Sequence, residues 1–200
     1  MAATPESVLA FWFGATGSAR ETSQRQRALW FGKSAEADRA VSVQFAESLT
    51  KARAGRLNHW AATPRGRLAL VIVLDQFPHH VFRDQVGAFS SDAQALDLAL
   101  AALATGEDRA LSLIERVFLY LPLEHAESLA MQNCAVALYA ALVRECADDE
   151  RALFEDFHEY AVRHRDVVAR FGRFPHRNAI LGRPSSAAEI EFLTQPGSRF

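Results

Sequence analysis

Seven consecutive apolar residues, Leu68 to Leu74, run directly into Asp75 and Gln76 near the middle of this 200-residue chain. A helix that is apolar on every side must be buried on every side, so this stretch predicts a central helix inside the core. Asp75 would share that burial, and an isolated buried charge is too costly unless it is paired, hydrogen-bonded or protonated. Pro78 is expected to stop the helix. The stretch therefore predicts a polar site beside the core.

Signals for helix starts recur along the rest of the chain, while alternating runs of β-branched residues between turns are absent from the sequence. Helices are predicted over these ranges: Thr4 to Gly14, Ser34 to Gly55, Thr63 to Pro78, Ser91 to Gly106, Asp108 to Pro122, Leu123 to Cys146, Asp148 to Gly172, and a short one from Ser186. The small, polar residues 14–27 are predicted to form a loop. Ser91 with Gln94, and Ser186 with Glu189, have the spacing of capping boxes. The predicted N-caps of other helices are Thr4, Ser34, Thr63 and Asp108.

This pattern predicts an all-α fold of about eight helices, in which short connections place neighbouring helices in antiparallel hairpins. No stretch of linker composition divides the chain, so we expect a single domain over residues 1–200. No apolar run approaches the roughly 18 residues needed to span a bilayer. The first residues are expected to form a helix and no signal peptide.

The net charge of −2 gives no reason to expect nucleic acid or an anionic membrane as a partner. The two cysteines, Cys134 and Cys146, are too few for a disulfide framework, which favours the reducing cytoplasm. Oligomeric state cannot be deduced from the sequence.

Glu124 and His125 follow Pro122 and are predicted to open the next helix, with Glu124 near its positive end. A carboxylate beside an imidazole suits general acid–base chemistry, because histidine titrates near neutrality. Consecutive residues on a helix diverge by about 100°, so the two need not face one site. Capping and site interpretations both stay open here. For Asp75, a structural role as a hydrogen-bond acceptor is favoured over a functional one.

His164 lies in the apolar stripe of the helix predicted over Asp148 to Gly172. A histidine there is more often a hydrogen-bonded core residue than a catalytic group. The helix leads into a turn rich in donors, formed by Arg173, His176, Arg177 and Asn178. The planar fork of arginine suits a carboxylate or a phosphate. The equally weighted alternative is a structural network in which these side chains satisfy carbonyls at helix C-termini and pair with Asp75, Glu115 or Glu124.

Metal binding is disfavoured by the spacing of the candidate ligands. Glu155 and His158 form one Glu-x-x-His pair, whereas a di-metal bundle site needs two such pairs and two further glutamates. His79 and His80 are consecutive, and no cysteine pair has zinc spacing. A glycine-rich phosphate loop, a Gly-x-Ser-x-Gly elbow and a nicotinamide fingerprint are all absent from the sequence. We therefore predict no metal and no cofactor.

Three long motifs, LALVIVLDQFP, ERVFLYLPLEHAE and RFGRFPHRNAILGRPSS followed by EFL, resemble the bacterial domain-of-unknown-function family 924. FWFG and LNHWAATPRGRLAL fit the same family. The resemblance implies a tetratricopeptide-like helical superhelix and no known activity. The chain departs from the family pattern at His79 and His80, where relatives usually have Arg and Asn, and at Ala126, where they often have Ser. If these positions touch a ligand, specificity differs from that of relatives.

Our leading hypothesis is an internal polar pocket for a small anionic ligand, because polar residues end strongly apolar helices in three segments. The predicted lining is Asp75, Arg83, Glu124, His125, His164, Arg173, His176, Arg177 and Asn178. If the protein is an enzyme, which the sequence leaves open, the candidate acid–base groups are His125, His164 and Glu124, and the arginines hold the anion.

The rival hypothesis is an interaction module that grips a peptide in a concave groove, as tetratricopeptide-like folds do. A closed pocket with convergent polar groups would support the first hypothesis. An open concave face with exposed aromatic residues would support the second. Trp12, Trp30 and Trp60 are predicted to belong to the core.

Overall fold

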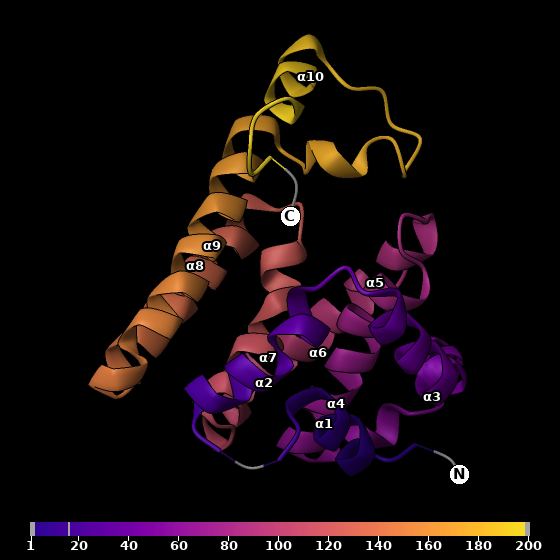
Figure 1. Cartoon of the computed structure of the whole chain (residues 1–200), viewed down its shortest axis with the longest axis vertical. Coiled ribbons are helices and arrows are strands. Elements are labelled where there is room, and N and C mark those ends of the chain that lie inside the picture. The colour runs from indigo at the N-terminus through magenta and orange to yellow at the C-terminus, as the bar shows by residue number, and fades with distance from the viewer. Residues whose placement is uncertain (1–2, 16, 199–200) are drawn as a thin grey trace.

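The computed structural model describes residues 3–15 and 17–198, and within these ranges the chain forms helices and turns with no strand (Figure 1). The all-α prediction is confirmed. The α-helices are α1 (Pro5–Phe13), α2 (Ala19–Phe31), α3 (Ala35–Arg53), α4 (Pro64–Val71), α5 (Phe77–Val81), α6 (Asp92–Thr105), α7 (Leu113–His125), α8 (Leu129–Glu145), α9 (Arg151–Phe171) and α10 (Ala187–Leu193). Shorter 3₁₀ turns cover Asn58–Ala62, Val86–Phe89, Glu107–Ala110, Asp148–Glu150 and Pro175–Arg177.

The apolar stretch forms the central helix, as predicted. It packs against α1, α6 and α7, and every residue from Leu68 to Leu74 is buried. The prediction that Pro78 stops this helix is wrong. A π-helical turn, Ile72–Gln76, joins α4 to α5 without a break. The proline is tolerated because its missing N–H falls in the first turn of α5, directly after the wide π turn.

Pro122 also lies inside a helix, in contrast to the prediction that it ends one. The helix α7 continues through Pro122 to His125, and the next helix begins only at Leu129. A proline removes one backbone hydrogen bond, and burial of α7 on almost every side compensates for that loss. Glu124 and His125 therefore end a helix, and the expectation that they open one at its positive end is wrong.

Several helix starts follow the predicted caps. The side chain of Thr4 accepts a hydrogen bond from the backbone of Ser7, and Ser34 and Thr63 cap α3 and α4 in the same way. The predicted loop over residues 14–27 is wrong, because a capping box between Ser18 and Glu21 starts α2 there. This helix is mostly polar, so its hydrophobic periodicity is weak and the capping box is the signal in the sequence that predicts it.

The capping box at Ser186 and Glu189 is confirmed, but two other predicted caps are wrong. The Ser91 hydroxyl donates to the carbonyl oxygen of Leu74 at 2.8 Å, so it ties the loop before α6 to the central helix and does not cap α6. Asp108 is buried and accepts a hydrogen bond from the Tyr120 hydroxyl at 2.7 Å. A capping box at Ser112 starts α7 in its place.

The long helices α8 and α9 lie side by side as an antiparallel hairpin along one flank of the molecule (Figure 1). One hydrophobic cluster runs from α1 to α9, and a small second cluster joins Val167, Val168 and Phe174 near the end of α9. Trp12, Trp30 and Trp60 are all buried, as predicted. A single domain and a tetratricopeptide-like superhelix remain predictions.

No helix in the described ranges is long and apolar enough to cross a membrane.

Candidate ligand-binding site

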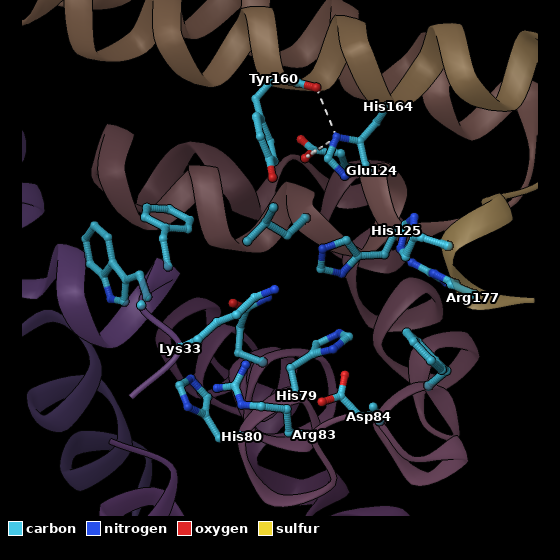
Figure 2. Close-up of a pocket in the computed structure, with 18 of the residues that line it drawn as sticks. Lys33, His79, His80, Arg83, Asp84, Glu124, His125, Tyr160, His164 and Arg177 are labelled. Carbon is cyan, nitrogen blue, oxygen red and sulfur yellow. Dashed lines mark hydrogen bonds and ion pairs between the residues drawn. The ribbon is translucent and has the colours of Figure 1, made fainter. Parts of the chain in front are cut away.

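A cavity of about 310 Å³ lies between the central helix, α7, α9 and the turn at Pro175–Arg177. Its walls combine aromatic, aliphatic and ionisable side chains from segments far apart in the sequence (Figure 2). The polar lining residues are Lys33, Gln76, His79, His80, Arg83, Asp84, Glu124, His125, Tyr139, Tyr160, His164, His176 and Arg177. Its size is within the range of small-molecule sites.

Asp75 is fully buried behind the cavity wall and holds His125 in place. The π turn carries Asp75, whose Oδ1 lies 2.8 Å from Nδ1 of His125, while Gln76 donates to its other oxygen. Burial acts to raise the pKa of Asp75, but the charge and hydrogen bond of His125 outweigh it and lower the pKa. Burial likewise opposes protonation of His125, yet Asp75 raises its pKa. The two form an ion pair, and Nε2 of His125 is left for the cavity.

His79 faces His125, with 5.5 Å between the ring centroids and the rings close to perpendicular (Figure 2). Its Nε2 atom is buried and has no hydrogen-bond partner among the described residues. Burial, together with the positive charge of His125, lowers the pKa of His79 to about 3. The ring is therefore neutral near pH 7 and presents an unsatisfied polar atom, which a bound ligand could satisfy.

Glu124 and His164 form a second buried pair, with 3.2 Å between Glu124 Oε1 and His164 Nδ1. The same nitrogen lies 3.0 Å from the carbonyl oxygen of Tyr160 (Figure 2). Burial raises the pKa of Glu124 to about 7 and lowers that of His164 to about 3. Near pH 7, Glu124 is therefore poised between its charged and neutral forms, whereas His164 is neutral.

Arg177 is buried with its guanidinium between the rings of Phe89 and Phe174, 4.7 Å from each centroid. Its Nη1 lies 3.3 Å from Asp92 Oδ2, which is long for a charge-assisted hydrogen bond. Its Nε is buried with no hydrogen-bond partner among the described residues. Burial and the charge of Asp75 raise the pKa of Asp92 to about 6. Arg177 thus has donor capacity that the protein leaves unused.

Arg83 lies on the rim and is already engaged. It donates to both oxygens of Asp38, at 2.7 and 2.5 Å, and His80 Nδ1 lies 2.9 Å from the same carboxylate. Lys33 also lines the cavity, and it forms no ion pair with any residue that the structure describes. The rim therefore offers one cation without a fixed partner.

The structure brings most of the predicted site residues together. Six of them line the cavity: Arg83, Glu124, His125, His164, His176 and Arg177. Asp75 does not line the cavity but lies behind its wall, where its hydrogen bond holds the ring of His125.

Two predicted site residues lie outside the cavity and stabilise the C-terminal segment. Arg173 donates to both oxygens of Glu189, at 2.7 and 2.9 Å. Asn178 is buried, donates a hydrogen bond to Ser185 and accepts one from Arg183. Arg183 in turn forms a bidentate pair with Glu127. For these two, the contacts are structural, but their partners are Glu189, Ser185 and Arg183 and not the acids Asp75, Glu115 or Glu124 that the alternative named.

Seven polar residues of the cavity were absent from the predicted set: Lys33, Gln76, His79, His80, Asp84, Tyr139 and Tyr160. The departure of His79 and His80 from the pattern of the resembled family was the one available signal. Lys33 lies in a short turn and Tyr160 on an otherwise charged stretch, so neither had a distinguishing pattern. Within the described ranges, no group of three or more His, Cys, Asp or Glu residues is arranged to hold a metal ion.

Fold and site together define an all-α protein with a histidine-rich cavity that opens to the surface. The family model described as "Bacterial protein of unknown function (DUF924)" matches residues 8–197, and the chain belongs to this family. The chain is also similar to the solved structure of a protein of unknown function from Agrobacterium tumefaciens, with 33% identity and a TM-score of 0.78. That similarity covers 94% of this chain and 96% of the other. A comparison with curated proteins found no match.

Proposed function

We propose that this protein binds a small organic anion in the cavity, and that His125 exchanges a proton with the bound molecule. The observation that carries the proposal is the convergence of unsatisfied buried polar atoms on one cavity. His79 Nε2 and Arg177 Nε are both buried without a hydrogen-bond partner among the described residues. Each such group costs roughly 1 to 3 kcal/mol until it is paired, so a ligand that pairs them recovers that free energy.

The charges near the cavity favour an anion. His125 has a raised pKa, Arg177 stays protonated despite its burial, and Lys33 has no fixed partner among the described residues. Glu124 is close to half protonated near pH 7, because its pKa is raised to about 7. The carboxylate of Asp75, fully buried behind the cavity wall, stays ionised and is neutralised by His125.

His125 is the best-placed acid–base group. Its Nδ1 is fixed by Asp75, which sets the tautomer and leaves Nε2 to accept or donate a proton in the cavity. His164 is held neutral by burial and is suited to hydrogen bonding. If the bound molecule is converted, His125 transfers the proton and Arg177 holds the anionic group. We place the protein in the cytoplasm, because both cysteines are free thiols.

The interaction-module hypothesis has less support. Of the exposed large apolar residues in the described ranges, only Phe31 and Tyr160 are aromatic, and both line the cavity. The three tryptophans are buried. A peptide groove would need a wider exposed aromatic surface.

The test is histidine NMR during titration with acetate, and separately with inorganic phosphate. The proposal expects the His79 and His125 signals to move with a saturable dependence on the anion. Arg177→Gln and His125→Gln should weaken binding at least tenfold, since each removes a charged contact.

His158→Gln is the matched control, because His158 lies on α9 outside the cavity lining. Retention of the helical circular dichroism signal would separate loss of binding from unfolding. The proposal is rejected if neither anion moves the two histidine signals, or if the control weakens binding as much as the cavity variants.

A further inference from the structure

The wall that α7 contributes to the cavity changes from apolar to ionisable along its length. Its lining residues are Val117, Leu121, Glu124 and His125. These positions are spaced four, three and one apart, so they follow one face of the helix. At a rise of about 1.5 Å per residue, the change takes place over roughly 12 Å.

The wall that α9 contributes changes in the same direction. Its lining residues are Phe157, Tyr160 and His164, again on one helical face. The pair between Glu124 and His164 aligns the ionisable ends of α7 and α9. Figure 2 shows Tyr160 and His164 on the ribbon that faces Glu124 across the top of the cavity. Two helices therefore set up a single polarity gradient.

The apolar end is completed by aromatic residues at the end of α2. Phe31 packs against Phe157 with 6.3 Å between ring centroids, and Trp30 contacts Phe118 at 4.5 Å. Trp30 and Phe31 both line the cavity. This end supplies a hydrophobic surface and no ionisable group from α7, whose residues there are Val117 and Leu121.

The opposite end contains the polar atoms that lack a partner among the described residues, His79 Nε2 and Arg177 Nε, together with the ion-paired His125. A ligand that fits both ends has one anionic group and one apolar body. Lys33 follows Phe31 in the lining but is exposed, and an ion pair with an exposed lysine contributes little, so a second charge at the apolar end would gain little and would lose the contacts of an apolar tail. The planar guanidinium suits a carboxylate as well as a phosphate, and we choose the carboxylate because it is the smaller and less highly charged of the two.

We propose that the ligand is a monocarboxylic acid with an apolar tail, whose carboxylate lies at Arg177, His79 and His125 and whose tail lies between α7 and α9 toward Trp30. This inference rests on the proposed function, because it names the class of anion that the cavity accepts. Acids with a second charged group, and small polar anions, satisfy only one end.

Calorimetric titration with acetate, butyrate, hexanoate and octanoate tests the inference. Each added methylene should tighten binding about fourfold, which corresponds to about 0.8 kcal/mol per buried methylene. Hexanedioate should bind at least tenfold more weakly than hexanoate. Leu121→Gln should flatten the dependence on chain length, whereas Arg177→Gln should weaken all four acids by a similar factor.

Fluorescence quenching locates the tail independently. Octanoate with bromine on its terminal carbon should quench the tryptophan emission of the wild-type protein. The same acid with bromine beside the carboxylate should quench it far less. In Trp30→Phe the difference should vanish, because Trp12 and Trp60 do not line the cavity.

The outcomes separate the two proposals. The inference is overturned, and the proposed function stands, if the four acids bind with no dependence on chain length. The same holds if phosphate alone binds, or if hexanedioate binds as tightly as hexanoate. If no acid and no phosphate binds, both are overturned. Equal quenching by the two bromo acids also contradicts the proposed orientation.

Discussion

His125 donates a hydrogen bond from Nδ1 to Oδ1 of Asp75 over 2.8 Å, and the two residues are 50 positions apart in the sequence. The donor is assigned because the lowered pKa of Asp75 keeps its carboxylate ionised, so it can only accept. The contact joins the π turn of the central helix to the last residue of α7. It fixes the imidazole whose other nitrogen is available to the cavity.

The first prediction concerns this pair. In Asp75→Asn, the pKa of His125 should fall below its ordinary value of 6.5, because burial then acts without the opposing carboxylate. Loss of one partner of a buried pair should also lower the free energy of unfolding by about 3 to 5 kcal/mol. NMR titration of His125 and urea denaturation measure the two effects. A His125 pKa that stays raised in the variant would contradict the assignment.

The pH dependence of the pair follows from the two shifts. The lowered pKa of Asp75 adds stability above its ordinary value of 3.8, which is lost as pH falls through the folded-state value. The raised pKa of His125 adds stability below 6.5, which is lost as pH rises through its folded-state value. The pair therefore contributes fully to the free energy of unfolding between pH 3.8 and pH 6.5.

The second prediction concerns Glu124, whose pKa burial raises from 4.5 to about 7. A raised pKa gives a contribution that is complete below pH 4.5 and is lost as pH rises through about 7. Relative to Glu124→Gln, the wild-type protein should lose on the order of 3 kcal/mol of unfolding free energy across that window. Urea denaturation at a series of pH values measures the difference. Parallel pH profiles for the two proteins would refute the prediction.

The third prediction separates binding from stability at His79. In His79→Phe, a ring of similar shape replaces a buried imidazole whose Nε2 has no hydrogen-bond partner among the described residues. Stability at pH 7 should be unchanged or higher, because the cost of that unsatisfied atom disappears. Binding of a carboxylate should weaken. The variant should also resist acid better, because the pKa of about 3 makes wild-type His79 destabilising as pH falls from 6.5.

Thermal denaturation and carboxylate titration of the same His79→Phe sample measure both properties. A variant that binds as tightly as the wild-type protein would remove His79 from the site. A large loss of stability at pH 7 would instead assign the residue a structural role.

The fourth prediction compares two glycines. A Cβ on Gly66 would lie 2.1 Å from the backbone oxygen of Trp60, so Gly66→Ala should lower the free energy of unfolding by about 3 kcal/mol or more. Gly172 has a φ of +69° with open space around it, so Gly172→Ala should cost only about 1 kcal/mol from backbone strain. Chemical denaturation of both variants gives the comparison. Equal losses would contradict the close approach of the backbone at Gly66.

The comparison of sequence with structure separates local signals from tertiary ones. Caps at Thr4, Ser34 and Thr63 predicted helix starts correctly, because a capping hydrogen bond spans only three residues. The predicted break at Pro122 was wrong, because packing on all sides of α7 outweighs the local preference of proline. The π turn was also missed, since nothing in an apolar run distinguishes it from an ordinary helical turn.

The sequence alone determined the helical class, the buried central helix and the fact that Asp75 needs a partner, because each depends on residues within one or two turns. Only the tertiary structure decided that this partner is His125 and that His79 and Arg177 share its cavity. It also placed Arg173 and Asn178 elsewhere, in contacts with the C-terminal segment. The physical reason is that hydrogen bonds across tens of residues depend on how helices pack, and packing is set by the whole core at once.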